Sequence, residues 1–324
     1  MIRWLLVGVV VSLSLVVADP VVRRIVTKSL LRKAPLPVHR VRQVKRPATT
    51  VTVPPDISYL SGVDDTRHGK KNLIAFALLT RENDKTWGGT KVQYAVYLRN
   101  MIRALRTEYP IGNPTTDLLL ISLESTSRET VDSLVRKYQL KLITLGEQQR
   151  LFVTPDTYTS PTQYRDQWVK LWLWNMTDYD LVLYIDADHY IRKPMAPLFD
   201  ICKGHAISAT IDSTGDINQD RSLGISDLYF NAGLIVLEPS AFHFNRMLHR
   251  LKQSSVWHSW AAEQGFFNWY WGKSYNILDS KWNVMHAGNK PDEYLRDASC
   301  IHTKIFEEFA ENHWLRREYS SIFN

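Results

Sequence analysis

Two aspartates, two residues apart, are the first candidates for chemistry in this chain. The stretch DLVLYIDADHYIRKP (180–194) places Asp186 and Asp188 directly after an apolar run, with only Ala187 between them. In a strand, residues two apart point to the same side and lie roughly 6–7 Å apart along the chain, so their carboxylates can converge on one hard cation. Such a cation, open on one side, suits a diphosphate and stabilises charge on a departing phosphate oxygen.

A turn offers a plainer interpretation of the same two acids. They could cap the turn into RKPM, where Arg192 and Lys193 could pair with them. We favour the cation site because a buried run precedes the acids and further motifs follow them along the chain.

Strand-like and helical segments alternate on the way to these acids. The pattern predicts an α/β fold with a mostly parallel central sheet and helices on both faces. Ligands of such sheets bind outside the carboxyl ends of the strands, where Asp186 and Asp188 lie. The strand-like runs are 72–80, 116–124 and 141–146, and the helical patterns are 90–110, 128–140 and the tryptophan-rich 164–177.

Composition and charge are those of a globular protein with a basic tail. The chain has 324 residues, 44% of them hydrophobic and 23% charged, enough for one large domain or two small ones. Residues 1–55 hold ten Lys or Arg and one acid, Asp19, whereas the net charge of the whole chain is only +7. The remainder is therefore mildly acidic, and we expect no nucleic-acid partner.

The tail predicts three divisions of the chain: a signal anchor or signal peptide (1–18), a basic, Pro-rich stem or linker (19–69) and a catalytic domain (70–324). The run from Trp4 to Ala18 is apolar and uncharged, and we expect a single-pass type II anchor in the Golgi or ER membrane. A cleaved signal peptide with secretion, an organellar transit peptide and a cytosol-facing anchor stay open. More positive charge follows the run than precedes it, opposite to the usual orientation rule.

Cys202 and Cys300 leave the redox compartment open. They could form one disulfide in an oxidising lumen or be two buried thiols. A homodimer is possible, and the sequence does not decide it.

Three motifs then follow one another in order: YIDADHYIRKPMAPLFD, YFNAGLIVLEPSAF and AAEQGFFNWYW. The set, spread over roughly 72–306, resembles the glycogenin-like family 8 glycosyltransferases of the nucleotide-diphospho-sugar transferase superfamily. That family pairs an Asp-x-Asp strand, an Asn-(Ser/Ala)-Gly strand and an Asp-Gln-Gly helix start. The resemblance implies a GT-A-type fold in a single catalytic domain, manganese dependence and retention of anomeric configuration.

The resemblance also implies site residues. It assigns Asp186, Asp188 and His302 to the metal. We expect Mn²⁺ there because imidazole suits softer cations than Mg²⁺; Mg²⁺ is the alternative. It assigns Glu263 and Gln264 to the acid-amide pair that faces the anomeric carbon. The expected donor-binding residues are Thr80, Asn83, Trp87, Lys170, Asp186, Asp212, Asn231, Ala232, Gly233 and Lys304.

Plainer interpretations exist for several of these residues. His302 could be a core histidine, Lys170 a solvated helix charge, and 231–233 a turn in which Gly233 allows close backbone approach.

The sequence departs from the family pattern near both ends of the motif set. Trp87 is the nearest substitute for an aromatic residue that stacks on uracil, and Glu263 replaces the usual Asp. Trp260 stands where glycogenin has another acid. The family's Gly-x-x-Lys-Pro-Trp run is replaced by HTKIFEEFAENHW, so Lys304 is the candidate for the phosphate-binding lysine.

The expected reaction is transfer of a hexose or N-acetylhexosamine from a nucleotide-diphosphate sugar, expected to be UDP-linked, to a glycan or protein hydroxyl. Classical retaining glycosidases place two carboxylates about 5–5.5 Å apart, but no second acid lies beside Glu263 in the sequence. We therefore expect a front-face route in which the leaving phosphate assists the hydroxyl. Glu263, ionised at a helix start, would orient the donor and stabilise positive charge.

Two other functions compete. An inactive sugar-binding or scaffold protein on the same fold would explain the missing lysine run. A haloacid-dehalogenase-type phosphatase also has Asp-x-Asp after an apolar strand, its first Asp being a phosphoryl nucleophile. That family generally starts its core with the motif and follows it with Thr or Val, unlike His189 and Tyr190 here.

Overall fold

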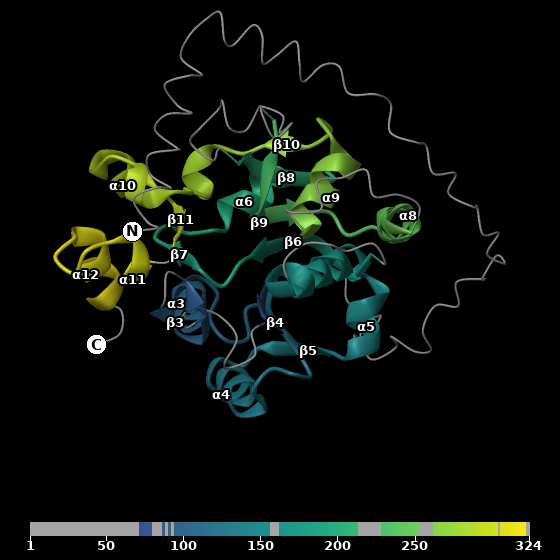
Figure 1. Ribbon diagram of the computed structural model, residues 1–324, viewed down its shortest axis with the longest axis horizontal. Coiled ribbons are helices and arrows are strands. Elements are labelled where there is room, and N and C mark those ends of the chain that lie inside the picture. Colours follow the sequence, from purple (N-terminus) through teal and green to yellow (C-terminus); the bar gives the residue numbers. More distant parts are fainter. Residues whose placement is uncertain are drawn as a thin grey trace, which may run out of the picture. The chain divides into compact units, whose positions relative to one another are not determined.

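A seven-stranded sheet is the centre of the computed structural model (Figure 1). In spatial order its strands are β10 (Asn276–Ile277), β8 (Ile207–Ile211), β9 (Phe230–Leu237), β6 (Tyr179–Ile185), β1 (Lys71–Leu78), β4 (Thr116–Leu123) and β5 (Lys141–Leu145). All neighbouring strands pair in parallel except β9, which is antiparallel to both β8 and β6. The structure describes residues 71–79, 86–87, 90–91, 94–155, 162–212, 228–252, 262–303 and 305–321.

The central strands are apolar along their whole length because helices cover both faces of the sheet. In β1 every residue from Leu73 to Leu78 is buried, and in β9 every residue is buried. Alternate residues of these strands enter separate cores on the two faces: Leu73 and Ala75 lie in one, and Ile74 and Phe76 in the other.

Three helices supply the apolar side chains of one face. They are α3 (Tyr94–Glu108), α4 (Arg128–Tyr138) and α6 (Pro197–Cys202). The helix α3 ends just before Pro110, which disfavours helical conformation in the residue before it. The helix α4 is capped at both ends: Ser127 Oγ accepts the N–H of Thr130, and Gln139 adopts a left-handed conformation at φ 46°.

The opposite face is covered by aromatic-rich helices. They are η2 (Thr162–Asn175), α8 (Ala241–Leu251) and α9 (Ala262–Trp271), with the short α5 (Glu147–Phe152) beside them. Trp168 of η2 packs on Phe266 of α9, and Trp174 packs on Phe267, with ring centroids 5.8 and 4.9 Å apart. These contacts fix η2 and α9 relative to one another, and both helices carry predicted site residues.

A small antiparallel sheet stands next to the main one. Its strands are β7 (His189–Ile191) and β11 (Cys300–His302), and His302 pairs with His189 in register. Figure 1 shows this sheet beside α10 (Asp292–Asp297), α11 (Ile305–Glu308) and α12 (Trp314–Ser321). Glu318 of α12 accepts the Tyr190 hydroxyl at 2.9 Å and Arg192 Nε at 2.8 Å, which ties α12 to the segment that follows Asp188.

The remaining elements are short. They are β2 (Thr86–Trp87), β3 (Thr90–Lys91), η4 (Ser280–Trp282) and η5 (Ala287–Asn289).

The predicted order of strands and helices is confirmed, with one difference in type. The segment predicted as a helix over 164–177 is a 3₁₀ helix over Thr162–Asn175, unusually long for that conformation. In a 3₁₀ helix residues three apart are aligned, and this places Lys170 in the same row as Leu173. Within the predicted helix 90–110, the regular α-helix starts only at Tyr94.

Predictions on the tail fall outside the described residues. The chain divides into units Met1–Asp56 and Ile57–Asn324, and every described residue belongs to the second. The segments 1–18 and 19–69 therefore stay predictions. In the part of the chain that is described, no helix is both long and apolar enough to cross a membrane. Cys202 and Cys300 are buried free thiols.

Candidate active site

The two aspartates lie in a tight turn between the main sheet and the small one. Asp186 follows β6, and its N–H donates to Gly233 O at 2.7 Å, which extends the pairing of β6 with β9 by one residue. The His189 N–H donates back to Asp186 O at 3.3 Å and closes the turn into β7. Asp186 and Asp188 therefore lie at the carboxyl edge of the sheet, as expected for a ligand site in this class of fold.

A buried lysine holds the first aspartate. Lys170 Nζ lies 3.1 Å from Asp186 Oδ1 and 2.9 Å from Glu263 Oε1, and it donates to Ala232 O at 3.2 Å. Its side chain is only 2% exposed. Burial lowers the pKa of Lys170, but Asp186 and then Glu263 outweigh burial, so the net shift is upward and the ammonium stays charged. One cation thus faces two acids.

Tyr184 contacts both Asp186 and Lys170 of this cluster. Its hydroxyl donates to Asp186 Oδ1 at 2.8 Å, and Lys170 Nζ lies 4.9 Å from its ring centroid. Burial raises the pKa of Tyr184 well above its ordinary value, and the Asp186 carboxylate raises it further. The phenol is therefore a permanent donor that fixes Oδ1 of Asp186.

Glu263 is buried at the start of α9. The residue before it, Ala262, has a positive φ of 46°, a conformation that costs a non-glycine residue about 1–2 kcal/mol. Burial raises the pKa of Glu263, and Lys170 opposes that rise. The ion pair with Lys170 adds a partner that the sequence did not place beside Glu263, where only the helix dipole was expected to stabilise its charge.

Three predicted site residues converge on Gly233. A Cβ at Gly233 would lie 2.7 Å from His302 Cε1, 2.8 Å from Asn231 Oδ1 and 3.0 Å from Asp186 Oδ2. Only glycine fits without movement of these groups. Asp186 Oδ2 and His302 Cε1 are no further apart than the sum of their two distances to that point, so the structure brings the predicted ligands Asp186 and His302 together.

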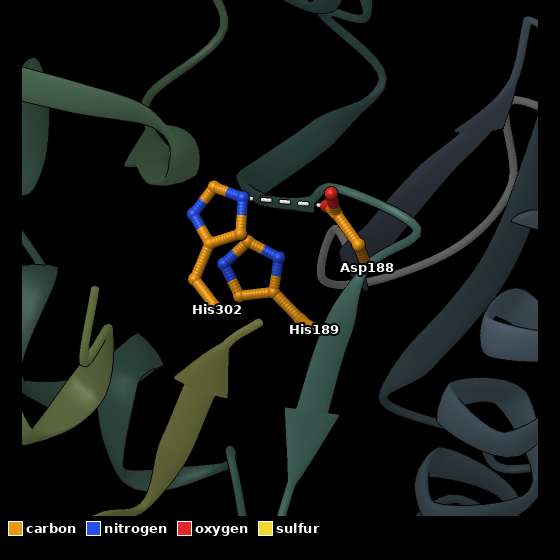
Figure 2. Close-up of side chains that lie close together, drawn as sticks. All are labelled: Asp188, His189 and His302. Atoms are coloured by element: carbon orange, nitrogen blue, oxygen red, sulfur yellow. Dashed lines mark ion pairs between the residues drawn. The ribbon is translucent and has the colours of Figure 1, made fainter. Parts of the chain in front are cut away.

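Asp188 and His302 approach one another directly. His302 Nε2 lies 3.3 Å from Asp188 Oδ1, the contact drawn as a dashed line in Figure 2. Among the described residues, Asp188, His189 and His302 form a group whose possible metal-ligating atoms all lie within 4.8 Å of one another. The structure thus places His189 beside two of the predicted ligands, Asp188 and His302.

The nitrogens of His189 are already engaged. Nδ1 lies 3.0 Å from Asp186 O, and Nε2 lies 3.1 Å from Asn283 Oδ1. Its ring stacks on His302 with centroids 4.1 Å apart (Figure 2). Burial lowers the pKa of His189 well below its ordinary value, and His302 lowers it further. We therefore assign His189 to support of the site and retain Asp186, Asp188 and His302 as the candidate ligands.

Asp212, Asn231 and Gln264 form a polar wall between Gly233 and the end of β8. Gln264 Oε1 accepts the Ala232 N–H at 2.8 Å, and Gln264 Nε2 donates to Asp212 Oδ2 at 2.7 Å. Asn231 Nδ2 donates to the same Asp212 oxygen at 3.2 Å. The structure therefore groups these predicted residues, which come from the residue after β8, from β9 and from α9.

Not every predicted residue can be located. Thr80, Asn83 and Lys304 lie outside the described residues, and Trp87 belongs to β2 without a described side chain. Their assignment to the donor remains a prediction.

Sequence reasoning missed three residues that touch this site: Tyr184, His189 and Asn283. Tyr184 lies two residues before Asp186 on the same side of the strand, and that spacing was a usable signal. His189 directly follows Asp188, but a histidine beside a metal ligand gives no indication of its own role. Nothing local marks Asn283, which is fully buried 94 residues after His189.

The fold and the grouping of acids, amides and a histidine at the strand ends define an α/β protein of the nucleotide-sugar transferase type. The sequence model of Glycosyl transferase family 8 matches residues 90–304, about two-thirds of the chain. The chain belongs to this family.

Similar proteins agree with this family. A glycogenin of Neurospora crassa is 30% identical over 172 residues, 51% of this chain and 22% of the relative. A putative UDP-glucuronate:xylan alpha-glucuronosyltransferase 5 of Arabidopsis thaliana is 28% identical over 153 residues, 40% of this chain and 24% of the relative. The chain thus spans about a quarter or less of these two relatives.

The fold is also that of a solved galactosyltransferase. The structure of LgtC in complex with donor and acceptor sugar analogs superposes with a TM-score of 0.51 at 17% identity, over 77% of this chain and 94% of that one. This likeness confirms the predicted GT-A-type fold in a single domain.

Proposed function

We propose that this chain is a metal-dependent retaining glycosyltransferase that transfers a hexose or N-acetylhexosamine from a UDP-linked sugar to a glycan or protein hydroxyl. The observation that carries the proposal is that Asp186 and His302 converge on Gly233 while Asp188 lies 3.3 Å from His302, in a chain of Glycosyl transferase family 8. The UDP moiety is supported by the name of the glucuronosyltransferase relative. The proposal names the sugar and the acceptor only by these chemical classes.

The residues present fit a divalent cation. Two carboxylates and an imidazole are ligand types that Mn²⁺ accepts, and the bare Cα of Gly233 leaves their approach unobstructed. The side chains of Asp186 and His302 are each 21% exposed, so a ligand can reach them. Bound there, Mn²⁺ would neutralise the diphosphate of the donor and stabilise it as a leaving group; Mg²⁺ is the alternative ion.

The remaining residues suit binding and orientation of the sugar. Asp212, Asn231 and Gln264 form a wall of hydrogen-bonding groups at the same strand ends. Their mutual hydrogen bonds hold each side chain in one orientation, and such groups can select a sugar by its hydroxyls. We assign them to the donor sugar.

Glu263 suits an electrostatic role. Its side chain is only 5% exposed and its carboxylate is paired with Lys170 at 2.9 Å, so it is poorly placed to attack an anomeric carbon. We propose a front-face reaction. The bond from the anomeric carbon to the phosphate oxygen breaks, the acceptor oxygen bonds to the same face, and the acceptor proton passes to the departing phosphate. Glu263 then stabilises the positive charge that develops on the sugar.

The test measures Mn²⁺-dependent UDP binding by calorimetry and UDP-sugar hydrolysis across a panel of sugars. We expect the full chain to bind UDP only with the cation and to hydrolyse at least one donor. Asp188→Asn should lose both activities. Asp180→Asn removes an exposed acid on β6, the strand that leads to Asp188; this variant is the matched control and should keep both.

Three results would contradict the proposal. Cation-independent binding, or unchanged turnover in Asp188→Asn, would remove the metal assignment. Cation-dependent UDP binding without turnover of any donor or acceptor would favour the inactive sugar-binding protein instead.

For the whole chain we propose a Golgi or ER membrane location through residues 1–18. The support is the apolar run from Trp4 to Ala18 in the sequence. Resistance of the full chain to alkaline carbonate extraction from cell membranes is the expected result, and release into the supernatant would contradict the anchor.

A further inference from the structure

Two side chains outside the assigned site connect its two halves. His189 and Asn283 are 2% and 0% exposed, and neither belongs to the candidate metal ligands or to the polar wall. His189 contacts the acid turn through Asp186 O and contacts His302 by stacking. Asn283 Nδ2 donates to Asn231 Oδ1 at 3.0 Å.

The orientation of Asn283 follows from its neighbours. Asn231 Oδ1 accepts the Gly233 N–H at 2.9 Å, and Asn231 Nδ2 donates to Asp212 and Gln264. Rotating the Asn231 amide would place its oxygen against two acceptor oxygens, so its orientation is fixed. Asn283 must then present Nδ2 to Asn231 and Oδ1 to His189 Nε2, which donates to it.

The result is one continuous path of contacts. It runs from the carbonyl of Asp186, which accepts the His189 backbone N–H at 3.3 Å, through the His189 ring and the Asn283 amide to Asn231. One end of this path is the turn that carries the candidate metal ligands, and the other is the turn that we assign to the donor sugar. The path is buried from the His189 ring to Asn231, and buried hydrogen bonds are costly to leave unmade.

We propose that His189 and Asn283 are positioning residues that hold the metal ligands and the sugar-binding wall in one fixed relation. His189 supports the His302 imidazole with the face of its ring and holds the Asp186 carbonyl through its backbone N–H. Asn283 transmits this placement to Asn231. The inference rests on the proposed function, because it assigns these residues to the same metal and donor site.

Supporting hydrogen bonds around metal ligands are worth about 10–100-fold in metal affinity or activity. Asn283→Ala should therefore raise the dissociation constant of Mn²⁺, measured by electron paramagnetic resonance of the free ion, by about tenfold. Its UDP-sugar hydrolysis should recover when Mn²⁺ is raised in proportion. Loss of the Asn231 contact should also raise the KM for the donor at saturating Mn²⁺.

His189→Phe separates the stacking of His189 on His302 from its hydrogen bond to Asn283. This variant also serves as the test if Asn283→Ala fails to fold. It keeps an aromatic ring against His302 but removes both nitrogens. We expect weaker Mn²⁺ binding here as well. Asn100→Ala is the matched control, since Asn100 is a buried asparagine on α3 whose side chain makes no hydrogen bond within the described structure. It should leave Mn²⁺ and UDP binding unchanged.

The outcomes separate this inference from the proposed function. A wild-type chain that binds no Mn²⁺ would overturn both. A wild-type chain that binds Mn²⁺ and UDP, with His189→Phe and Asn283→Ala matching it in Mn²⁺ affinity and donor KM, would overturn the positioning role alone. Equal changes in Asn100→Ala and Asn283→Ala would also overturn it, because the effect would then be one of general stability.

Discussion

At the amino ends of the parallel strands, Asp117 of β4 lies between two lysines. Lys141 Nζ is 2.7 Å and Lys71 Nζ 3.3 Å from its carboxylate oxygens, and the Tyr179 hydroxyl donates to it at 3.2 Å. At the carboxyl ends, Lys170 lies between the acids Asp186 and Glu263. Both clusters combine acid, lysine and tyrosine side chains, but the residues of the first lie on strands, whereas Lys170 and Glu263 of the second come from the helices η2 and α9.

The balance of charge differs between the two edges. The amino-edge cluster has more cations than acids and is partly open to solvent, with the Lys141 side chain 45% exposed. Burial raises the pKa of Asp117, but Lys141 and Lys71 outweigh it and hold the pKa below the ordinary value. The carboxyl-edge cluster is buried and has more acids than cations, with Asp188 close by. The charge of the acid in the amino-edge cluster is already balanced by lysines, whereas the excess of acids in the carboxyl-edge cluster suits a further cation.

The largest expected difference between the edges comes from removing one lysine at each. Lys170→Met leaves the buried Glu263 and the partly exposed Asp186 without their cation, and breaking a buried pair such as Lys170–Glu263 costs about 3–5 kcal/mol. Lys141→Met removes an exposed partner and should cost about 1 kcal/mol or less. Urea unfolding of the two variants measures both values. Similar losses would show that the two clusters do not differ in character.

The second prediction concerns the rate of reaction. Glu263→Gln keeps the shape of the side chain and removes its charge beside Lys170. We expect a loss of about 2–4 kcal/mol in transition-state stabilisation, seen in kcat with the affinity for UDP nearly unchanged. Donor turnover and calorimetry with UDP measure the two quantities. A wild-type sample trapped with donor and carrying one sugar's mass on Glu263 would contradict the front-face reaction.

A third prediction tests the convergence on Gly233. Gly233→Ala places a methyl group 2.7 Å from His302 Cε1, and overpacking of this kind costs about 1–3 kcal/mol of stability. Mn²⁺ binding should weaken at the same time because His302 and Asp186 must move apart. Gly288→Ala is the control, since its nearest neighbour lies at an ordinary 3.7 Å. Unaltered Mn²⁺ affinity in Gly233→Ala would count against a shared ligand site there.

The smallest expected effect is at the amino edge and depends on pH. Asp117 has a lowered pKa in the folded chain, so it adds stability above its unfolded pKa of about 3.9, and this stability is lost as pH falls through the folded pKa. Asp117→Asn should cost about 1 kcal/mol or less at pH 7 and flatten the acid limb of the stability curve. Denaturant midpoints from pH 3 to 7 check this, with donor turnover unchanged at pH 7. A steep acid limb retained in the variant would assign the effect to other groups.

Sequence patterns predicted the strands well because they depend on local physics. The buried run before Asp186 and the apolar run of β1 are continuous, as parallel strands covered on both faces must be. The predicted helix over 164–177 was less accurate in type. Aromatic packing of Trp168 and Trp174 against α9, which no periodicity encodes, accompanies its 3₁₀ conformation.

The sequence by itself determined the order of the strands along the chain, the two acids at a strand end and the family resemblance of the motifs. Tertiary structure decided which groups meet. Lys170 reaches Glu263 and Ala232, and His189 reaches Asn283, only because the sheet returns distant segments to one edge. The physical reason is that local pattern fixes backbone conformation and burial, whereas a buried charge or amide takes the partner that the packed chain brings within hydrogen-bond distance.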